Sequence, residues 1–116
     1  MKKTVTIKSN CDFRRVYGKG KSIQGPALVS YVLKNRAGIC RIGITTSKKI
    51  GNAVERNRSR RVIRAAYSMI EDKIHENYDF VFVARAKTKY VKSTQLALLM
   101  LSQLQEAGVI NEKTDN

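Results

Sequence analysis

Cationic side chains are concentrated in one stretch, residues 47–64, which reads SKKIGNAVERNRSRRVIR and contains a single acid, Glu55. Its Lys and Arg residues are Lys48, Lys49, Arg56, Arg58, Arg60, Arg61 and Arg64. Guanidinium groups present a planar fork of donors that fits phosphate oxygens and also stacks on bases. With so few acids nearby, the mutual repulsion of these charges would destabilise the stretch unless an external anion were bound. The pattern therefore favours nucleic-acid binding over a helix face that is merely solvated.

The same stretch carries the start signal of a helix. Asn52 is a good N-cap and Glu55 stands three positions later, as in a capping box, so we expect the helix to begin at Ala53. At about 100° per residue the helix separates into a cationic and an apolar side. The cationic side holds Arg56, Asn57, Arg60, Arg61 and Arg64, and the apolar side holds Val62, Ile63, Ala66, Met69 and Ile70. Such a helix can lie on a sheet and still present its arginines to a polyanion.

No group of side chains in the sequence suits catalysis by this chain alone. His75 is the single histidine, the acids are scattered, and no glycine-rich phosphate loop is present. Cys11 and Cys40 lack metal-ligand spacing, so we expect two small buried side chains, a reducing compartment and no bound metal. Any reaction must come from a partner beside which the basic domain holds a substrate.

Length and composition predict one folded basic domain, residues 1–110, followed by a polar tail, 111–116, that we expect to be frayed. The chain has 116 residues, a net charge of +14 and 42 % hydrophobic residues. Nucleic acid is the expected partner, and an anionic membrane is the weaker option. Because no apolar run is long enough for a membrane span or a signal peptide, we expect a cytoplasmic protein.

The remaining elements can be placed by pattern. Residues 9–20 predict a helix that is capped by Ser9 and stopped by Gly18, with Phe13 and Tyr17 on one face. Strands are expected at 27–33 and 39–46, paired as an antiparallel hairpin. The basic helix should run to around His75. A buried strand at 80–84 should lie parallel to strand 39–46, and a last helix should begin after a cap at residue 93 or 94. These elements predict an α+β two-layer sandwich of order αβββαβα with a small mixed sheet of three or four strands.

The pattern Ser-Lys-Lys-x-Gly-Asn-Ala-Val-x-Arg-Asn-Arg at residues 47–58 resembles the signature of the bacterial ribonuclease P protein component, and the resemblance extends over most of the chain. It implies a non-catalytic protein subunit that binds a large catalytic RNA and assists endonucleolytic removal of the 5′ leader from precursor tRNA. In the family the RNA carries the hydrolysis with divalent metal ions such as Mg²⁺, and DNA and membranes are not partners. A structural RNA-binding protein, such as a ribosomal protein, is the alternative that charge and fold also allow.

The resemblance also implies roles for particular residues. The positions expected to face the RNA are Lys48, Lys49, Asn52, Arg56, Asn57, Arg58, Arg60, Arg61 and Arg64. The positions expected to hold the single-stranded leader are Phe13, Tyr17 and Tyr31, which by pattern alone would belong to the core. The resemblance further implies a left-handed crossover between the parallel strands. Two departures stand out: Ala-Arg-Ala-Lys at 84–87, where the family often has Ala-Arg-Lys-Pro, and Ser59, where many relatives carry a bulky aliphatic residue.

Overall fold

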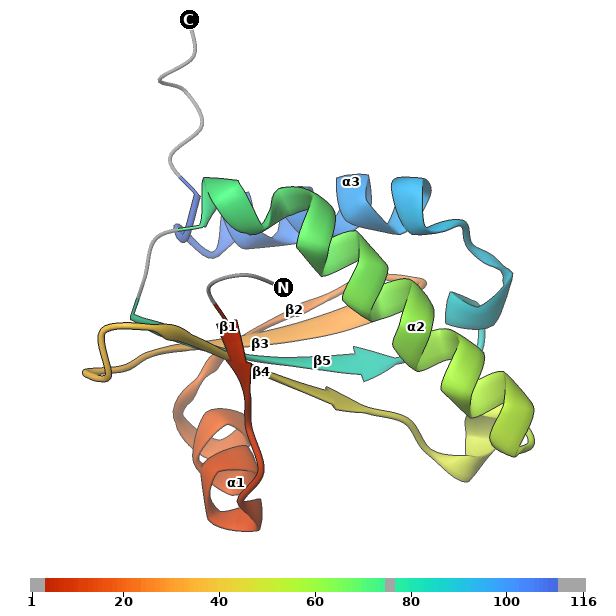
Figure 1. Ribbon diagram of the computed structural model, residues 1–116, viewed down its shortest axis with the longest axis horizontal. Coiled ribbons are helices and arrows are strands. Elements are labelled where there is room, and N and C mark those ends of the chain that lie inside the picture. Colours follow the sequence, from red (N-terminus) through yellow and green to blue (C-terminus); the bar gives the residue numbers. More distant parts are fainter. Residues whose placement is uncertain (1–3, 75–76, 111–116) are drawn as a thin grey trace, which may run out of the picture.

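The computed structural model describes residues 4–74 and 77–110 (Figure 1). In chain order the elements are β1 (Thr4–Thr6), α1 (Asn10–Lys19), β2 (Lys21–Gln24), β3 (Leu28–Lys34), β4 (Cys40–Thr45), the short 3-10 helix η1 (Lys48–Ile50), α2 (Ala53–Ile70), η2 (Glu71–Lys73), β5 (Tyr78–Ala84), η3 (Thr88–Tyr90) and α3 (Ser93–Glu106). The α+β class and the order αβββαβα are confirmed, with the short strand β1 added in front. Within the described residues no helix is long and apolar enough to cross a membrane.

The five strands form one mixed sheet in the order β1-β4-β5-β3-β2. β5 lies parallel to β4 and antiparallel to β3, so the predicted parallel strand-helix-strand unit, β4-α2-β5, is confirmed. The predicted β3–β4 hairpin is wrong, because β5 lies between these two strands. β5 takes this central place because it is apolar on both faces: Phe80 and Phe82 are fully buried on one, and Val81 on the other.

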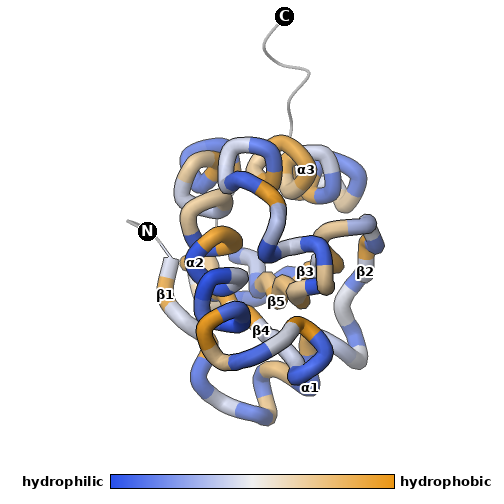
Figure 2. The backbone as a smooth tube through the Cα atoms, turned by 90° about the vertical axis from the view of Figure 1, so that its right-hand side faces the viewer, coloured by the Kyte–Doolittle hydropathy of each residue, from blue (hydrophilic) through white to orange (hydrophobic). Residues whose placement is uncertain are grey.

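Helices cover both faces of the sheet (Figure 1). α2 and α3 lie on one face, where Phe80 and Phe82 pack with Tyr67 of α2 and with α3. α1 lies on the other face, where Val16 packs against Val81. Hydrophobic strands run between α3 and α1 (Figure 2). The predicted two layers therefore describe the sheet with α2 and α3, and α1 adds a smaller third layer.

Several boundaries and burial predictions differ in detail. α1 continues through Gly18 to Lys19, with Gly20 at its C-cap position, and the N-cap position of α3 is Lys92, not residue 93 or 94. Cys11 is exposed, whereas Cys40 is buried as expected. α2 ends at Ile70 and η2 extends the turn to Lys73. The predicted helix end at residue 75 and the tail at 111–116 lie outside the described residues.

The apolar side of α2 is rotated relative to its prediction. Met69 is 50 % exposed, whereas Tyr67, which the wheel places beside the arginines, is fully buried. The Tyr67 hydroxyl lies 2.9 Å from Thr4 Oγ1, and the Thr4 hydroxyl donates to Glu71 Oε2 at 2.7 Å. Burial is the main cause that raises the pKa of Tyr67, so this phenol stays neutral. Strand β1 is thus tied to the end of α2 by a buried polar cluster.

Candidate nucleic-acid interface

The N-terminus of α2 is fixed by the predicted capping box. Asn52 Oδ1 accepts a hydrogen bond from the Glu55 amide at 2.9 Å, and Glu55 Oε1 accepts one from the Asn52 amide at 3.0 Å. The hydrogen bond from the Asn52 amide is the main cause that holds the pKa of Glu55 below its usual range, and the hydrogen bond from Lys89 is the next largest. Gly51 has a φ of 141°, which favours glycine, and a Cβ there would collide with the Glu55 carboxylate. Local sequence therefore sets where the helix begins.

The cations of this region differ in what they contact. Arg56 is half-buried and turns back to donate from Nη1 to the Gly51 carbonyl at 2.8 Å. Arg60 Nη1 donates to Asn57 Oδ1 at 3.1 Å. Four arginines of α2 are exposed, and we call them the outer arginines: Arg58, Arg60, Arg61 and Arg64. Lys48, Lys49 and Asn52 are also exposed, on η1 and just ahead of α2.

The outer arginines have no ion pair with an acid of the described residues. Within the described part of the chain, the ion pairs join Asp12 and Asp79 to Arg15 and Arg41, and Glu55 to Lys89. None of these pairs includes an outer arginine. Unpaired like charges on one helix repel each other, and this repulsion is relieved when a polyanion binds. Ser59 lies on the opposite, buried side of α2, as predicted, and donates to the Glu55 carbonyl at 3.1 Å.

A second candidate surface lies between α1 and the sheet. This α1 groove has a volume of about 370 Å³ and is lined by Asn10, Phe13, Arg14, Tyr17 and Thr45. Tyr17 is 38 % exposed, and its hydroxyl donates to Thr45 Oγ1 at 3.3 Å. Tyr31 does not line the groove but packs edge-on against the Tyr17 ring, with 4.9 Å between centroids. The structure therefore brings the three predicted aromatic residues together, with Tyr31 as the support of Tyr17.

Gly43 of β4 lets the groove form. A Cβ at this position would collide with the ring of Phe13, so the missing side chain allows the ring to lie directly on the strand.

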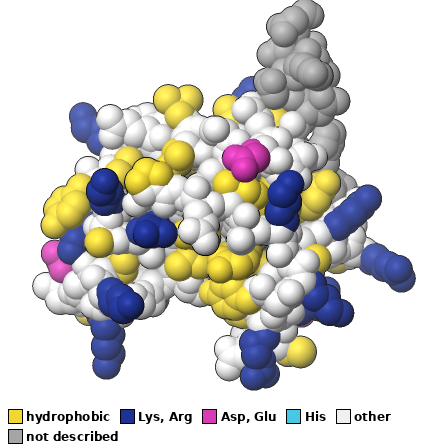
Figure 3. Space-filling model, turned by 180° about the vertical axis from the view of Figure 1, so that it is seen from behind, with side chains coloured by type: hydrophobic (Ala, Val, Ile, Leu, Met, Phe, Trp, Pro, Cys, Tyr) yellow, Lys and Arg dark blue, Asp and Glu magenta, His cyan; other side chains and the backbone are white. Residues whose placement is uncertain are grey.

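Seen from behind, hydrophobic side chains gather near the centre of the molecule, above a hollow in its lower edge, and Lys and Arg side chains surround them (Figure 3). The lining of the α1 groove combines the aromatic rings of Phe13 and Tyr17 with the cation Arg14, which suits a single-stranded nucleic acid.

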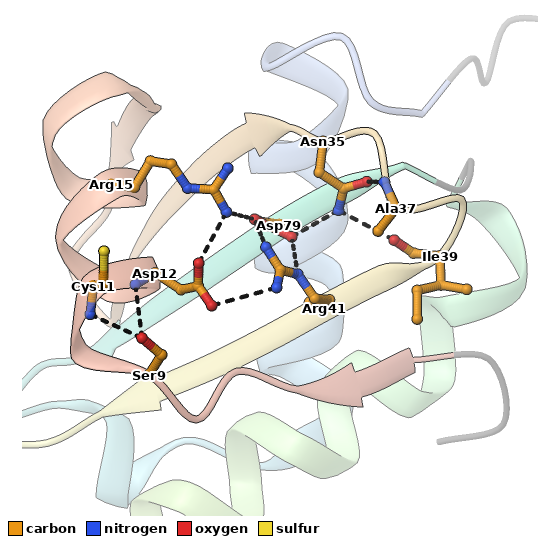
Figure 4. A network of polar contacts seen from close by, with 9 residues as sticks. All are labelled: Ser9, Cys11, Asp12, Arg15, Asn35, Ala37, Ile39, Arg41 and Asp79. Carbon is orange, nitrogen blue, oxygen red and sulfur yellow. Dashed lines mark hydrogen bonds and ion pairs between the residues drawn. The ribbon is translucent and has the colours of Figure 1, made fainter.

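A buried carboxylate holds α1 on the sheet. Asp79, whose side chain is 0 % exposed, accepts hydrogen bonds from Arg41 at 2.7 and 2.8 Å, from Arg15 at 3.0 Å and from Asn35 at 2.7 Å (Figure 4). Asp12 of α1 bridges the same two arginines at 3.2 and 3.4 Å. Arg41 and Asp79 are register partners on β4 and β5, and Arg15 reaches them from α1.

The charge state of Asp79 follows from this network. Burial by itself would raise the pKa of Asp79, but the hydrogen bonds from Arg41 and Asn35, with the charges of Arg41 and Arg15, outweigh it and lower the pKa. The hydrogen bond to Asp79 likewise raises the pKa of Arg41. Sequence reasoning missed the network, although an acid inside an otherwise apolar strand signals a buried partner.

Of the basic residues after β5, Lys89 has a structural role. Its ammonium donates to the Ile50 carbonyl at 2.5 Å and pairs with Glu55 Oε2 at 3.4 Å, while Arg58 Nε donates to the Lys89 carbonyl at 3.1 Å. These bonds attach η3 to the N-terminus of α2. Arg85, Lys87 and Lys92 are exposed. Of these basic residues, Lys89 therefore helps to hold the basic helix in place, and the other three are exposed to solvent.

Fold and surfaces together define a small α+β nucleic-acid-binding protein, in which a capped arginine-rich helix and an aromatic groove lie on one domain. The family model described as Ribonuclease P matches residues 1–108. The chain is 48 % identical over 88 residues to the ribonuclease P protein component of Clostridioides difficile, covering 75 % of this chain and 77 % of the relative. It is 42 % identical over 113 residues to that of Clostridium novyi, covering 96 % and 100 %.

Solved structures agree. The Staphylococcus aureus RNase P protein superposes with a TM-score of 0.76 at 36 % identity, covering 91 % of this chain and 97 % of that one. The RNase P protein from Thermotoga maritima gives a TM-score of 0.77 at 26 % identity, covering 87 % and 96 %. The chain therefore belongs to the ribonuclease P protein family. Its role is that of the protein subunit of this endoribonuclease, in partnership with ribonuclease P RNA, and the ribosomal alternative is not favoured.

Proposed function

We propose that the protein binds its two RNA ligands with two separate surfaces. The outer arginines bind the catalytic RNA together with Lys48, Lys49, Asn52, Arg56 and Asn57. The α1 groove binds the 5′ leader of precursor tRNA through Phe13 and Tyr17, with Tyr31 supporting Tyr17. The observation that carries the proposal is the row of exposed arginines on α2 without a carboxylate partner among the described residues. We expect this activity in the cytoplasm, and the domain to comprise residues 1–110.

In this proposal the protein assists cleavage without taking part in the chemistry. Its cations reduce the repulsion between two RNA backbones and hold the leader beside the RNA active site. Within residues 4–74 and 77–110 no group of three or more His, Cys, Asp or Glu side chains is placed to hold a metal ion. We assign the divalent ions, Mg²⁺ in the first instance, to the RNA of the assembled enzyme, where they would activate a water nucleophile and stabilise the phosphoryl charge.

The geometry of the α1 groove supports leader binding. The Tyr17 hydroxyl is anchored to Thr45 and its ring packs nearly perpendicular to the Tyr31 ring, so the Tyr17 ring is held in one orientation before a ligand arrives. Stacking on a pre-oriented ring tolerates any base, because every base has a π face. Arg14 at the groove can neutralise a neighbouring phosphate. A groove of this kind suits leaders of varied sequence.

The proposed RNA surface is tested by titrating the protein against its cognate RNA subunit at several salt concentrations. Arg60→Gln and Arg64→Gln should each weaken binding and reduce the slope of log K against log salt by about one unit per lost phosphate contact. Lys73→Gln is the matched control, since Lys73 is an exposed cation beyond the end of α2. Equal losses in all three variants would mean that net charge, not the α2 face, binds the RNA.

The proposed leader surface is tested with the reconstituted enzyme and two RNAs, precursor tRNA that carries the 5′ leader and the same tRNA without it. Tyr17→Ala should cost roughly 1–3 kcal/mol of affinity for the leader-bearing substrate only, which is the range for one lost base stack. Tyr17→Phe keeps the ring and should retain most of the affinity. If Tyr17→Ala and Arg60→Gln gave the same pattern of losses, the two-surface proposal would be wrong. Cleavage of precursor tRNA by the protein without RNA would also contradict it.

A further inference from the structure

A groove at the edge of the proposed RNA surface runs between α2 and the start of α3 and is lined in part by two of the outer arginines, Arg58 and Arg61. This α2–α3 groove has a volume of about 460 Å³, in the range of ordinary ligand sites. Its lining includes Arg58, Arg61, Val62, Ala65, Val91 and Lys92. The aliphatic side chains of Val62 and Val91 are half-buried, whereas the three cations are exposed. No carboxylate is among the described residues that line it, so the groove is apolar inside and positive at its margin.

Tyr90 lies next to this groove and is the most exposed aromatic side chain of the described residues, at 78 %. A smaller hollow of about 340 Å³, lined by Glu55, Arg58, Lys89 and Tyr90, adjoins it. Arg58 lines both hollows and connects them. Exposing a whole tyrosine ring to water forgoes the stabilisation that burial would give, and such rings are typical of surfaces that bind another molecule.

Local contacts hold the ring and the guanidinium group in place. Lys89 Nζ lies 5.3 Å from the centre of the Tyr90 ring, in cation–π geometry, while the same ammonium is bonded to the Ile50 carbonyl. Arg58 Nε donates to the Lys89 carbonyl, and within the described residues neither Nη group of Arg58 makes a hydrogen bond or an ion pair. The η3 turn therefore presents one aromatic face beside guanidinium donors that are oriented and available.

We propose that Tyr90 and the α2–α3 groove form a further RNA-binding site for one unpaired nucleotide and its flanking phosphates. The base stacks on Tyr90, and Arg58, Arg61 and Lys92 bind the phosphates. The assignment rests on the proposed function, because Arg58 and Arg61 belong to the same α2 face, which the groove extends toward α3. A double helix does not fit this description, since its bases are stacked on each other and cannot reach the ring.

RNA is favoured over an acidic protein segment by the combination of groups. Both ligands would be attracted by the cations and could pair with the forked guanidinium donors, but every nucleotide also carries a base that can stack on the exposed aromatic face. The rest of the surface points the same way, since the chain carries a net charge of +14. An acidic peptide becomes the answer if binding depends on the three cations and is indifferent to Tyr90.

The absence of tryptophan from the sequence allows a direct test. Tyr90→Trp introduces a single indole, and titration with a short single-stranded oligouridylate should quench its fluorescence, because a base stacked on the indole deactivates its excited state. The control is Ile39→Trp, in the turn before β4 at the opposite end of the sheet, where the side chain is also exposed. Quenching in the Tyr90→Trp variant but not in the Ile39→Trp variant supports the site; equal quenching in both, or none in either, overturns it.

Affinity provides the second readout, measured by anisotropy of the labelled oligouridylate on the full chain. Tyr90→Ala should weaken binding roughly 5- to 100-fold, Tyr90→Phe should bind like the parent, and Lys92→Gln should lower the salt dependence. Circular dichroism confirms that each variant is folded. An unchanged affinity in Tyr90→Ala, with Arg60→Gln still weakened toward the RNA subunit, would refute this site and leave the proposed function standing. Loss of binding in Lys92→Gln alone would also overturn the stacking site and identify an electrostatic site for an acidic peptide or a bare phosphate.

Discussion

Asp79→Asn is the substitution that most directly tests how α1 is held on the sheet. The change keeps size and shape but removes the negative charge that Arg41 and Arg15 share. Asn35, which donates to Asp79 Oδ1, keeps an acceptor if the new amide turns its oxygen toward it. What is lost is the charge and, because an NH2 group then stands where Oδ2 was, the acceptor of the hydrogen bonds from Arg41 Nη2 and Arg15 Nη2, at a site where the original side chain is fully buried.

The expected cost can be worked out from the exposure of the partners. Removing one member of a fully buried ion pair costs about 3–5 kcal/mol, because the remaining charge stays unpaired away from water. Here the side chains of Arg41 and Arg15 are 23 % and 37 % exposed, so water can solvate the two guanidinium groups after the change. We therefore expect a loss of about 2 kcal/mol, below the range for a buried pair.

Urea unfolding measures this loss directly, and Asp72→Asn is the matched control. Asp72 is an exposed acid in η2, and its replacement should change the free energy of unfolding by less than about 0.5 kcal/mol. Because the network fastens α1, Asp79→Asn should also weaken binding of leader-bearing substrate more than it weakens binding to the RNA subunit. A stability within error of the parent would refute the assignment of the network as the fastening of α1.

Measuring the free energy of unfolding at low pH separates the electrostatic contribution of Asp79 from its contribution to packing. The pKa of Asp79 is lowered on folding, so its contribution is fully present above the unfolded value of about 3.9 and is lost as the pH falls through the lower folded value. The parent should therefore lose stability below about pH 4, and the difference between parent and Asp79→Asn should shrink there. A difference that stayed constant down to about pH 2 would show that packing, not charge, accounts for the loss.

Three further substitutions test contacts that hold the elements of the fold in place. Gly43→Ala should push the Phe13 ring out of its place, cost about 1–3 kcal/mol in urea unfolding and weaken binding of the leader. Lys89→Met should remove the bonds that tie η3 to α2 and cost about 1–2 kcal/mol, with exchange of the amides at the start of α2 accelerated in hydrogen-exchange experiments. Tyr67→Phe should cost about 1 kcal/mol in urea unfolding by removing the bond to Thr4, without any change in RNA affinity.

Features that depend on a few neighbouring residues were predictable from the sequence. The capping box of Asn52 and Glu55 fixes the start of α2 through bonds that span three positions, so the pattern alone placed the helix correctly. The long apolar run of β5 likewise indicated a central strand. The resemblance brought together Phe13, Tyr17 and Tyr31, which the structure places side by side, whereas pattern alone assigned them to the core.

Features that depend on the relative placement of distant elements were not predictable in the same way. The turn after Lys34 suggested a hairpin, but pairing is decided by which strand must be covered on both faces, and β5 displaced β4 from β3. The wheel of α2 gave the correct polar–apolar division for most positions but placed Met69 on the apolar side and did not identify Tyr67 as a core residue, because the direction in which the helix faces the sheet is set by tertiary packing. The partners of Asp79 come from three elements far apart in sequence.

The central place of β5 has a consequence for the order in which the molecule can be completed. During synthesis β3 and β4 leave the ribosome well before β5, and until Ala84 has emerged neither strand has the neighbour that lies between them in the finished sheet. Their unpaired edges are then open to other chains, a known route to aggregation. A fragment that stops before residue 78 therefore lacks the strand that joins the two halves of the sheet. The complete sheet can form only after β5 has been synthesised.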